Sequence, residues 1–300
     1  MKKAYLFSGQ GSQYIGMEKI FENYTNISNH FFTKSEKILG YNILDIISNG
    51  DSETLNNTKY TQPAIFLISA IAYNIYKKNH TPPYCCAGHS LGEITALYAS
   101  EVLSFNDALR FIKKRAESME KAGKINPGKM LAIIKPKQLE VKGLLEKTSH
   151  LTIANYNSEN QIILSGSPKS INEALSFCKK NKMRSLLLPV SGAFHSSLMK
   201  PASDVLLKTI NELNFNNAIM PIYQNVDALP ETNKNSIKMN LIKQITSPVQ
   251  WQNTINNMIN DGISHFIELG PKNILTNMSK KLYEDITFDS YEEVMKNESI

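Results

Sequence analysis

Cysteines, long apolar runs and clusters of metal ligands are all scarce in this sequence of 300 residues. The three cysteines, two of them adjacent at positions 85 and 86, are too few for a disulfide framework and favour a reducing compartment. No run approaches the roughly 18 apolar residues that cross a bilayer, and the apolar stretch after Lys3 is too short for a signal peptide. We therefore expect a cytoplasmic protein that neither enters a membrane nor holds a metal ion.

Basic residues exceed acidic ones and give a net charge of +6, but they are spread along the chain. No basic stripe alternates with aromatic residues, which argues against nucleic-acid binding. A mildly positive surface suits an acidic protein partner or a phosphate-bearing substrate. A generally lysine-rich composition would explain the charge equally well.

The order of the predicted elements indicates an α/β fold with an inserted unit. Apolar patterning predicts strands at 3–7, 83–87, 221–223 and 265–269, and helices from 17 onward and at 63–76, 104–122, 196–213 and 240–259. Residues 128–189 instead follow the order β-α-β-β-α-β, the ferredoxin-like pattern. We expect an α/β-hydrolase-like large domain with a mostly parallel central sheet (1–125 and 195–300) and a small ferredoxin-like α+β subdomain (126–194). The acidic, weakly patterned residues 283–300 are expected to form a loosely packed tail.

Residues 88–93, Gly-His-Ser-Leu-Gly-Glu, are the most informative segment of the chain. They fit the pattern Gly-x-Ser-x-Gly between a predicted buried strand and a predicted helix, which is the context of a nucleophile elbow. The glycines leave room for a tight turn, and the helix N-terminus behind Ser90 favours the negative charge that develops when a carbonyl is attacked. The plainer alternative is a tight turn in which Ser90 only caps the helix.

A serine nucleophile needs a base, and His195 is the strongest candidate among the six histidines. It stands where a strand passes through a turn of small residues into a helix, so its alternative role is that of a helix-entry residue. His89 adjoins Ser90 on the elbow itself, and its ring should point away from the serine oxygen. Asp107 is the only aspartate between Ser90 and His195, and its place in the helix after the elbow weakens a Ser-His-Asp triad. We expect a dyad whose second imidazole nitrogen is held by another acceptor, such as a backbone carbonyl.

Arg115 falls on the apolar face of the helix predicted at 104–122. A guanidinium on a buried face needs an anionic partner. That partner is either a carboxylate of the protein, such as Glu117, or a carboxylate of a substrate held by two parallel hydrogen bonds. The residues alone slightly favour the structural role.

Together these segments resemble one family over nearly the whole chain: the malonyl-CoA:acyl-carrier-protein transacylases of fatty-acid synthesis and the related acyltransferases of polyketide synthases. The resemblance is carried by segments 9–13 (Gly-Gln-Gly-Ser-Gln), 61–64 (Thr-Gln-Pro-Ala), 88–93, Arg115, 153–158 (Ile-Ala-Asn-Tyr-Asn-Ser), 192–196 (Gly-Ala-Phe-His-Ser), 244–251 (Gln-Ile-Thr-Ser-Pro-Val-Gln-Trp) and 267–271 (Ile-Glu-Leu-Gly-Pro). Two departures are small: Ser8 stands where proline is common, and Lys272-Asn273 replaces Gly-Lys.

The resemblance implies a role for each matching position. Ser90 would carry the acyl group, His195 would act as the general base, and the main-chain carbonyl of Gln244 would orient the histidine. The backbone N–H groups of Gln10 and Leu91 would form the oxyanion hole, where Gly9 and Gly11 allow the first loop to approach closely. The implied substrate-binding residues are Arg115, which would hold the free carboxylate of malonyl, together with Phe194, Gln62, Asn155 and Asn157. Bulky Phe194 before the histidine is similar to the malonyl-selective form, because it would crowd an α-methyl branch.

The resemblance also implies a ping-pong reaction with a coenzyme A thioester as substrate, no bound cofactor, an acidic acyl carrier protein as partner, and a monomeric chain. One alternative is a thioester hydrolase on the same scaffold, which would share Ser90 and His195. Arg115 argues against it, because a hydrolase of uncharged acyl chains gains nothing from a buried guanidinium. A catalytically inactive carrier-docking protein is the second alternative, and the intact Ser90, His195 and Arg115 argue against that. The sequence leaves open whether the carrier serves fatty-acid or polyketide synthesis.

Overall fold

A six-stranded sheet forms the centre of the structure, a computed structural model that describes residues 1–298. Its strands run in the order β10–β9–β1–β2–β7–β8, and every neighbouring pair is parallel except β7 and β8. Their bounds are β1 Lys2–Phe7, β2 Cys85–Gly88, β7 Ile222–Tyr223, β8 Pro230–Glu231, β9 Ile263–Glu268 and β10 Thr287–Ser290. All of β2 is buried, as expected of a strand covered on both faces. The predicted, mostly parallel central sheet is therefore confirmed.

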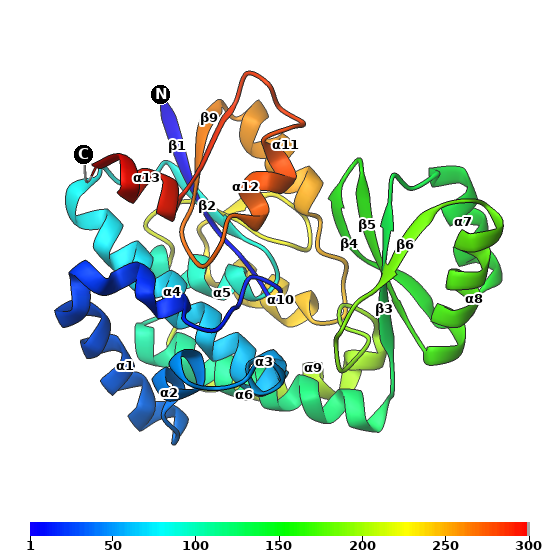
Figure 1. The fold of residues 1–300 in the computed structure, drawn as a ribbon, viewed down its shortest axis with the longest axis horizontal. Coiled ribbons are helices and arrows are strands. Elements are labelled where there is room, and N and C mark those ends of the chain that lie inside the picture. Colours follow the sequence, from blue (N-terminus) through cyan, green and yellow to red (C-terminus); the bar gives the residue numbers. More distant parts are fainter. Residues whose placement is uncertain (299–300) are drawn as a thin grey trace.

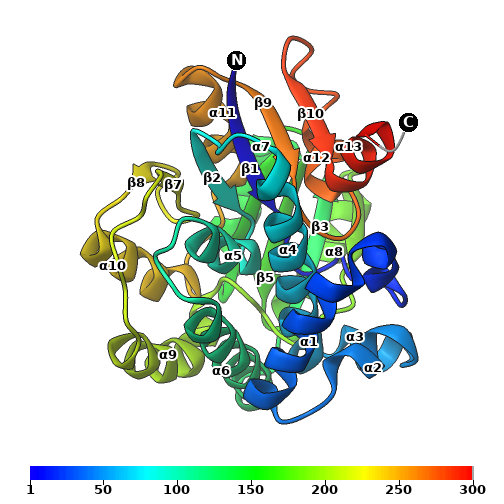
Figure 2. The same ribbon diagram turned by 90° about the vertical axis from the view of Figure 1, so that its left-hand side faces the viewer.

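Helices cover both faces of this sheet (Figure 1, with the perpendicular view in Figure 2). Alternate residues of β1 serve different cores: Tyr5 and Phe7 pack with α4, α5 and α6, whereas Ala4 and Leu6 pack with α11. The helices of this part are η1 Met17–Tyr24, a 3₁₀ segment, α1 Thr25–Leu39, α2 Ile43–Ser48, α3 Ser52–Asn56, α4 Thr58–Asn79, α5 Leu91–Ala99, α6 Phe105–Ile125, η2 Ser197–Met199, α9 Lys200–Glu212, α10 Lys234–Gln244, α11 Trp251–Asn260 and α12 Ile274–Ser279. None of the helices in the described chain is long and apolar enough to cross a membrane.

A smaller antiparallel sheet stands to one side of the central sheet (Figure 1), with strand order β4–β5–β3–β6. Its elements follow the chain as β3 Lys129–Ile134, α7 Gln138–Lys147, β4 Leu151–Ser158, β5 Gln161–Gly166, α8 Pro168–Lys180 and β6 Arg184–Leu187. One face packs on α7 and α8 through residues such as Leu131 and Leu164. The other face, with Met130 and Ile163, joins the core of the large sheet. This is the ferredoxin-like unit that the order of elements predicted.

Strand β4 is tied to the large part of the molecule by main-chain hydrogen bonds. The Tyr156 N–H donates to the Val249 carbonyl at 2.9 Å, and the Val249 N–H donates to the Ala154 carbonyl at 2.8 Å. Asn155 and Val249 thus form a parallel bridge just after helix α10. The bridge fixes the β4 asparagines beside the carboxyl end of β2, where the elbow lies.

The expectation of a loosely packed tail at 283–300 is wrong for residues 287–298, which form β10 and helix α13 Tyr291–Glu298. Phe288 and Tyr291 are each 1 % exposed, and the Phe288 ring stacks on Phe266 with centroids 4.7 Å apart. Residues 299 and 300 lie outside the described part of the chain.

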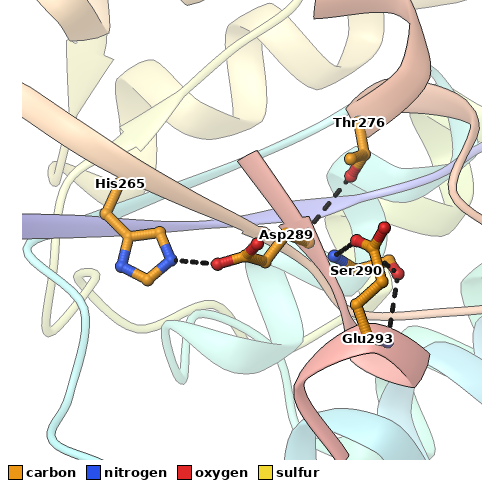
Figure 3. A network of polar contacts seen from close by, with 5 residues as sticks. All are labelled: His265, Thr276, Asp289, Ser290 and Glu293. Atoms are coloured by element: carbon orange, nitrogen blue, oxygen red, sulfur yellow. Dashed lines mark hydrogen bonds and ion pairs between the residues drawn. The ribbon is translucent and has the colours of Figure 1, made fainter. Parts of the chain in front are cut away.

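The acidic residues that made this segment look like a solvated tail have specific partners (Figure 3). Asp289 Oδ2 lies 2.8 Å from His265 Nε2 on the neighbouring strand, and the Asp289 carbonyl accepts a bond from Thr276 Oγ1 at 3.3 Å. Ser290 and Glu293 form a capping box, in which Glu293 Oε2 accepts the Ser290 N–H at 2.9 Å and Ser290 Oγ accepts the Glu293 N–H at 3.3 Å. Acidic composition alone therefore did not indicate disorder here.

Candidate functional site

The turn between β2 and α5 holds Ser90 at φ +53° and ψ −104°, a backbone conformation that non-glycine residues rarely adopt. A Cβ on Gly88 would lie 2.0 Å from the main chain of Gly92, and a Cβ on Gly92 would lie 2.0 Å from the Phe7 carbonyl. Both glycines are therefore needed for the strand and helix to meet this closely. The geometry is that of a nucleophile elbow, and the alternative of a simple cap fails because Ser90 makes no side-chain cap bond.

Ser90 and His195 meet although 105 positions separate them in the chain. Ser90 Oγ lies 2.8 Å from His195 Nε2, and His195 Nδ1 lies 2.9 Å from the Gln244 carbonyl and 3.2 Å from the Ser247 carbonyl. Because both carbonyls are acceptors, Nδ1 carries the proton and Nε2 accepts the Ser90 hydroxyl proton. Burial, followed by the nearby Arg115 charge, lowers the pKa of His195 to about 3, so the imidazole is neutral at pH 7 and its Nε2 lone pair is free to accept a proton.

Arg115 enters the site from the middle of α6 and is 1 % exposed. Its Nη1 donates to Gln62 Oε1 at 2.8 Å, and its Nη2 donates to Gln244 Oε1 at 3.2 Å and to Ser90 Oγ at 3.1 Å. Burial lowers the pKa of Arg115 to about 10, which still leaves it charged at neutral pH. Glu117 is not its partner: no carboxylate within residues 1–298 forms an ion pair with it, and its buried Nε makes no hydrogen bond there.

A cavity of about 210 Å³ opens in front of these groups. Ser90, His195 and Arg115 line it together with Gln10, Leu91, Asn155 and Phe194, and apolar side chains such as Met130 and Ile163 close the opposite side. Leu91 is the first residue of α5, so its N–H has no acceptor within the helix. The loop bearing Gln10 lies against the elbow, since a Cβ on Gly9 would be 2.4 Å from the His89 carbonyl. Gly11 has no such contact, and its φ of +109° explains its glycine instead.

His89 points away from Ser90, as expected, and towards strand β4. Its Nε2 lies 2.9 Å from Asn157 Oδ1 and 3.2 Å from Asn155 Nδ2, and burial lowers its pKa. These three side chains also line a second cavity of about 440 Å³ that adjoins the first along the cleft between the two sheets. Gln62 is fully buried and lines neither cavity, so it contacts Arg115 rather than the open space.

Sequence reasoning missed three residues at this site: Ser247, Glu93 and Asn225. The Ser247 carbonyl is a second acceptor for His195, and Asn225 Oδ1 accepts the Ser90 N–H at 2.6 Å. Asn225 lies two residues after Tyr223, the last residue of β7, which pairs with Ala87 of the elbow strand. Polar residues directly after a strand that neighbours the elbow strand were the available indication.

A buried Ser–His pair on the elbow of an α/β-hydrolase-like sheet defines the class of Ser–His hydrolases and acyltransferases. The comparisons narrow this class. The chain belongs to the acyl transferase domain family, whose model matches residues 4–299.

Several relatives are similar over their full length. The malonyl CoA-acyl carrier protein transacylase of Bacillus subtilis is 37% identical over 286 residues, which covers 94% of this chain and 90% of the relative. That of Escherichia coli is 33% identical over 295 residues, covering 97% and 96%. The crystal structure of an acyl carrier protein S-malonyltransferase from Vibrio cholerae superimposes with a TM-score of 0.93 at 32% identity, covering 100% of this chain and 99% of that one. A malonyl-transacylase in complex with its type II PKS acyl-carrier protein does so with a TM-score of 0.93 at 28% identity, covering 100% of both chains.

Proposed function

We propose that this chain transfers a malonyl group from coenzyme A to the phosphopantetheine thiol of an acyl carrier protein, through an acyl-Ser90 intermediate. The observation that carries the proposal is the placement of Arg115. Its guanidinium lies 3.1 Å from Ser90 Oγ, is fully charged at neutral pH, and keeps a buried Nε without a partner in the described chain. A diacid bound as a thioester at one end would satisfy it with the carboxylate at the other. The names of the full-length relatives support the same substrate pair.

In the acylation step, Ser90 Oγ attacks the thioester carbonyl while its proton passes to His195 Nε2. The Gln244 and Ser247 carbonyls keep Nδ1–H in place and stabilise the imidazolium that forms. The N–H groups of Gln10 and Leu91 hold the developing oxyanion. When the tetrahedral intermediate collapses, the carbon–sulfur bond breaks and the coenzyme A sulfur takes the proton back from His195.

The second half-reaction repeats these steps with a different nucleophile. The carrier's thiol gives its proton to His195 Nε2, its sulfur attacks the acyl-Ser90 carbonyl, and Ser90 leaves with the proton returned. Hydrolysis by the same site would need water as the nucleophile. The hydrolase alternative is not favoured, because the full-length relatives are transacylases and because Arg115 selects a charged acyl group.

Five residues would bind the substrate or position the group that binds it. Arg115 would bind the malonyl carboxylate, and Gln62, which accepts its Nη1–H at 2.8 Å, would keep the guanidinium aimed at the cavity. Phe194 lines the cavity next to His195 and would exclude an α-methyl branch. Asn155 and Asn157, which line the second cavity, would bind the amides of the pantetheine arm.

We further propose that the chain acts in the cytoplasm as a monomer, and that its catalytic domain (1–125 and 195–300) and small subdomain (126–194) meet at the cleft. Sedimentation of the purified chain tests the monomeric state, since a dimer would contradict it. Limited proteolysis tests the division into domain and subdomain, because cleavage near residues 125 and 195 is expected before cleavage within either sheet.

Incubation with radiolabelled malonyl-CoA tests the proposed function directly. The wild-type chain should retain label on the peptide that contains Ser90 and pass it to an added holo acyl carrier protein. Ser90→Ala should retain none, whereas Ser176→Ala, which alters an exposed serine of α8, should behave as wild type. Label that persists on Ser90→Ala, or label on the wild type that passes only to water, would refute the proposal.

A further inference from the structure

A buried carboxylate lies directly behind the elbow, and the reaction described above does not use it. Glu93 is in the first turn of α5, has no exposed surface, and lines neither cavity of the cleft. Within residues 1–298 it forms no ion pair at contact distance, but the charge of Arg115 and a hydrogen bond from the Gln244 side chain both favour its ionised form. A carboxylate in such a place costs several kcal/mol unless hydrogen bonds compensate it. Its presence therefore needs a reason beyond packing.

The hydrogen bonds of Glu93 hold the loop that follows β7. Its Oε2 accepts the main-chain N–H of Asn225 at 2.7 Å, and its Oε1 accepts Gln224 Nε2 at 3.3 Å. Burial raises the pKa of Glu93 to about 7, and the bond from the Asn225 N–H is the first contribution that opposes this rise. The carboxylate thus fixes the position of Asn225.

The side chain of Asn225 in turn holds the elbow on both sides of His89. Its Nδ2 donates to the Gly88 carbonyl at 2.7 Å, and its Oδ1 accepts the Ser90 N–H at 2.6 Å. The Ser90 carbonyl is held separately by Gln244 Nε2 at 3.1 Å. The N–H of the strained residue is therefore bonded to the Asn225 side chain, and its carbonyl accepts both the Gln244 side chain and, at 3.2 Å, the Glu93 main-chain N–H.

We propose that Glu93 and Asn225 are positioning residues, a two-residue brace that fixes the Ser90 peptide so that Oγ faces His195 and the Leu91 N–H faces the oxyanion. The inference rests on the proposed acyl transfer at Ser90. A conformation at φ +53° costs about 1–3 kcal/mol and persists only where the surroundings determine it. Without the brace, the elbow relaxes, and the Oγ-to-Nε2 alignment at 2.8 Å is lost even though every group that touches substrate is intact.

The test compares Asn225→Ala with Asn257→Ala. Asn257 Nδ2 donates to the Ala228 carbonyl at 2.9 Å, so its removal also costs one amide hydrogen bond to the same loop but does not touch the elbow. Each variant is assayed for malonyl transfer, for labelling of Ser90 by a small neutral fluorophosphonate, and for its thermal midpoint. Asn225→Ala should lower kcat and the labelling rate about 100-fold with KM within about twofold, because a misplacement near 1 Å costs a factor of this size.

Asn257→Ala should lose a similar amount of stability and keep the wild-type labelling rate. Glu93→Gln, which keeps an acceptor for the Asn225 N–H, should restore labelling that Glu93→Ala loses. Should the alanine variants fail to fold, Asn225→Ser serves, because its hydroxyl cannot hold Gly88 and Ser90 together. The brace is refuted if folded Asn225→Ala or Asn225→Ser is labelled at the wild-type rate, or if Asn257→Ala is slowed equally.

The fluorophosphonate lacks a carboxylate, so this readout does not depend on malonyl recognition. A wild-type chain that reacts with neither the probe nor malonyl-CoA would overturn the acyl-transfer proposal itself. If the wild-type chain reacts with the probe and with malonyl-CoA, and Asn225→Ala reacts with both equally fast, only the proposed brace would be overturned.

Discussion

The two sides of the cleft are built on different principles. The side formed by the central sheet carries the buried charge and the strained backbone: Ser90 at the elbow, Arg115 at 1 % exposure, and His195 held by two carbonyls. The side formed by the antiparallel sheet carries neutral amides, Asn155 and Asn157, and apolar residues such as Ile163. We therefore expect bond making and recognition of the malonyl carboxylate on the first side, and contacts to the pantetheine arm on the second. Substitutions on the two sides should therefore separate kcat from KM.

Among the substitutions that test this comparison, Arg115→Ala should have the largest effect on malonyl transfer. Arg115 would form a buried, hydrogen-bonded charge pair with the malonyl carboxylate, and removing one partner of such a pair costs about 2–5 kcal/mol. Malonyl transfer should therefore fall by roughly one and a half to three and a half orders of magnitude in kcat/KM. Transfer of acetyl, which has no carboxylate, should rise. Arg110→Ala, on the same helix with a side chain that is 61% exposed, is the matched control and should match wild type in both assays. Near-normal malonyl transfer by Arg115→Ala would make this arginine structural.

A smaller effect concerns how stability depends on pH through His195. The unfolded imidazole takes a proton below pH 6.5, whereas burial lowers the folded pKa to about 3. Between these values the unfolded chain binds more protons, so the free energy of unfolding falls with decreasing pH by up to about 1.4 kcal/mol per unit. Urea unfolding at pH 7, 6 and 5 should show this slope reduced in His195→Gln and unchanged in His150→Gln. Equal slopes in all three proteins would mean that the pKa of His195 is the same in the folded and the unfolded chain.

The smallest expected effect is that of Asn155→Ala on the other side of the cleft. Loss of one neutral hydrogen bond to the substrate costs about 1 kcal/mol. KM for malonyl-CoA should rise about fivefold with kcat unchanged, while Asn172→Ala, which alters an exposed residue of α8, should have no effect. A clear fall in kcat of Asn155→Ala would contradict the proposed division between the two sides.

The sequence predicted the central fold well where local pattern and tertiary role agree. The elbow at 88–93 has a strand before it and a helix after it, and residues 128–189 follow the β-α-β-β-α-β order. Both features could therefore be predicted from the sequence. The Ser90–His195 pairing was expected from residue chemistry, but its distance was not, because the chain between them includes the whole antiparallel sheet. The tail was mispredicted because Asp289 and Glu293 look solvated until His265 and Ser290 are placed beside them.

Arg115 shows the limit of reasoning from one residue. A buried guanidinium indicated a carboxylate in direct contact, but its hydrogen bonds go to neutral Gln62 and Gln244, and the Glu93 charge acts on it without an ion pair. Nothing in the spacing of residues 62, 115 and 244 reveals that they converge. Glu93 was within the recognised elbow and yet had no assigned role, since its partner Asn225 lies 132 positions away.

The short segment 244–249 has a mechanical consequence for turnover. Its carbonyls at 244 and 247 align His195, and Val249 at its end is bonded to β4. The cleft therefore has one stiff edge, because an outward movement of β4 would pull on the segment whose carbonyls hold His195. Strand β6 forms the opposite border of that sheet, far from this anchor. We expect coenzyme A and the carrier arm to exchange along the border formed by β6, which would leave Ser90 and His195 aligned.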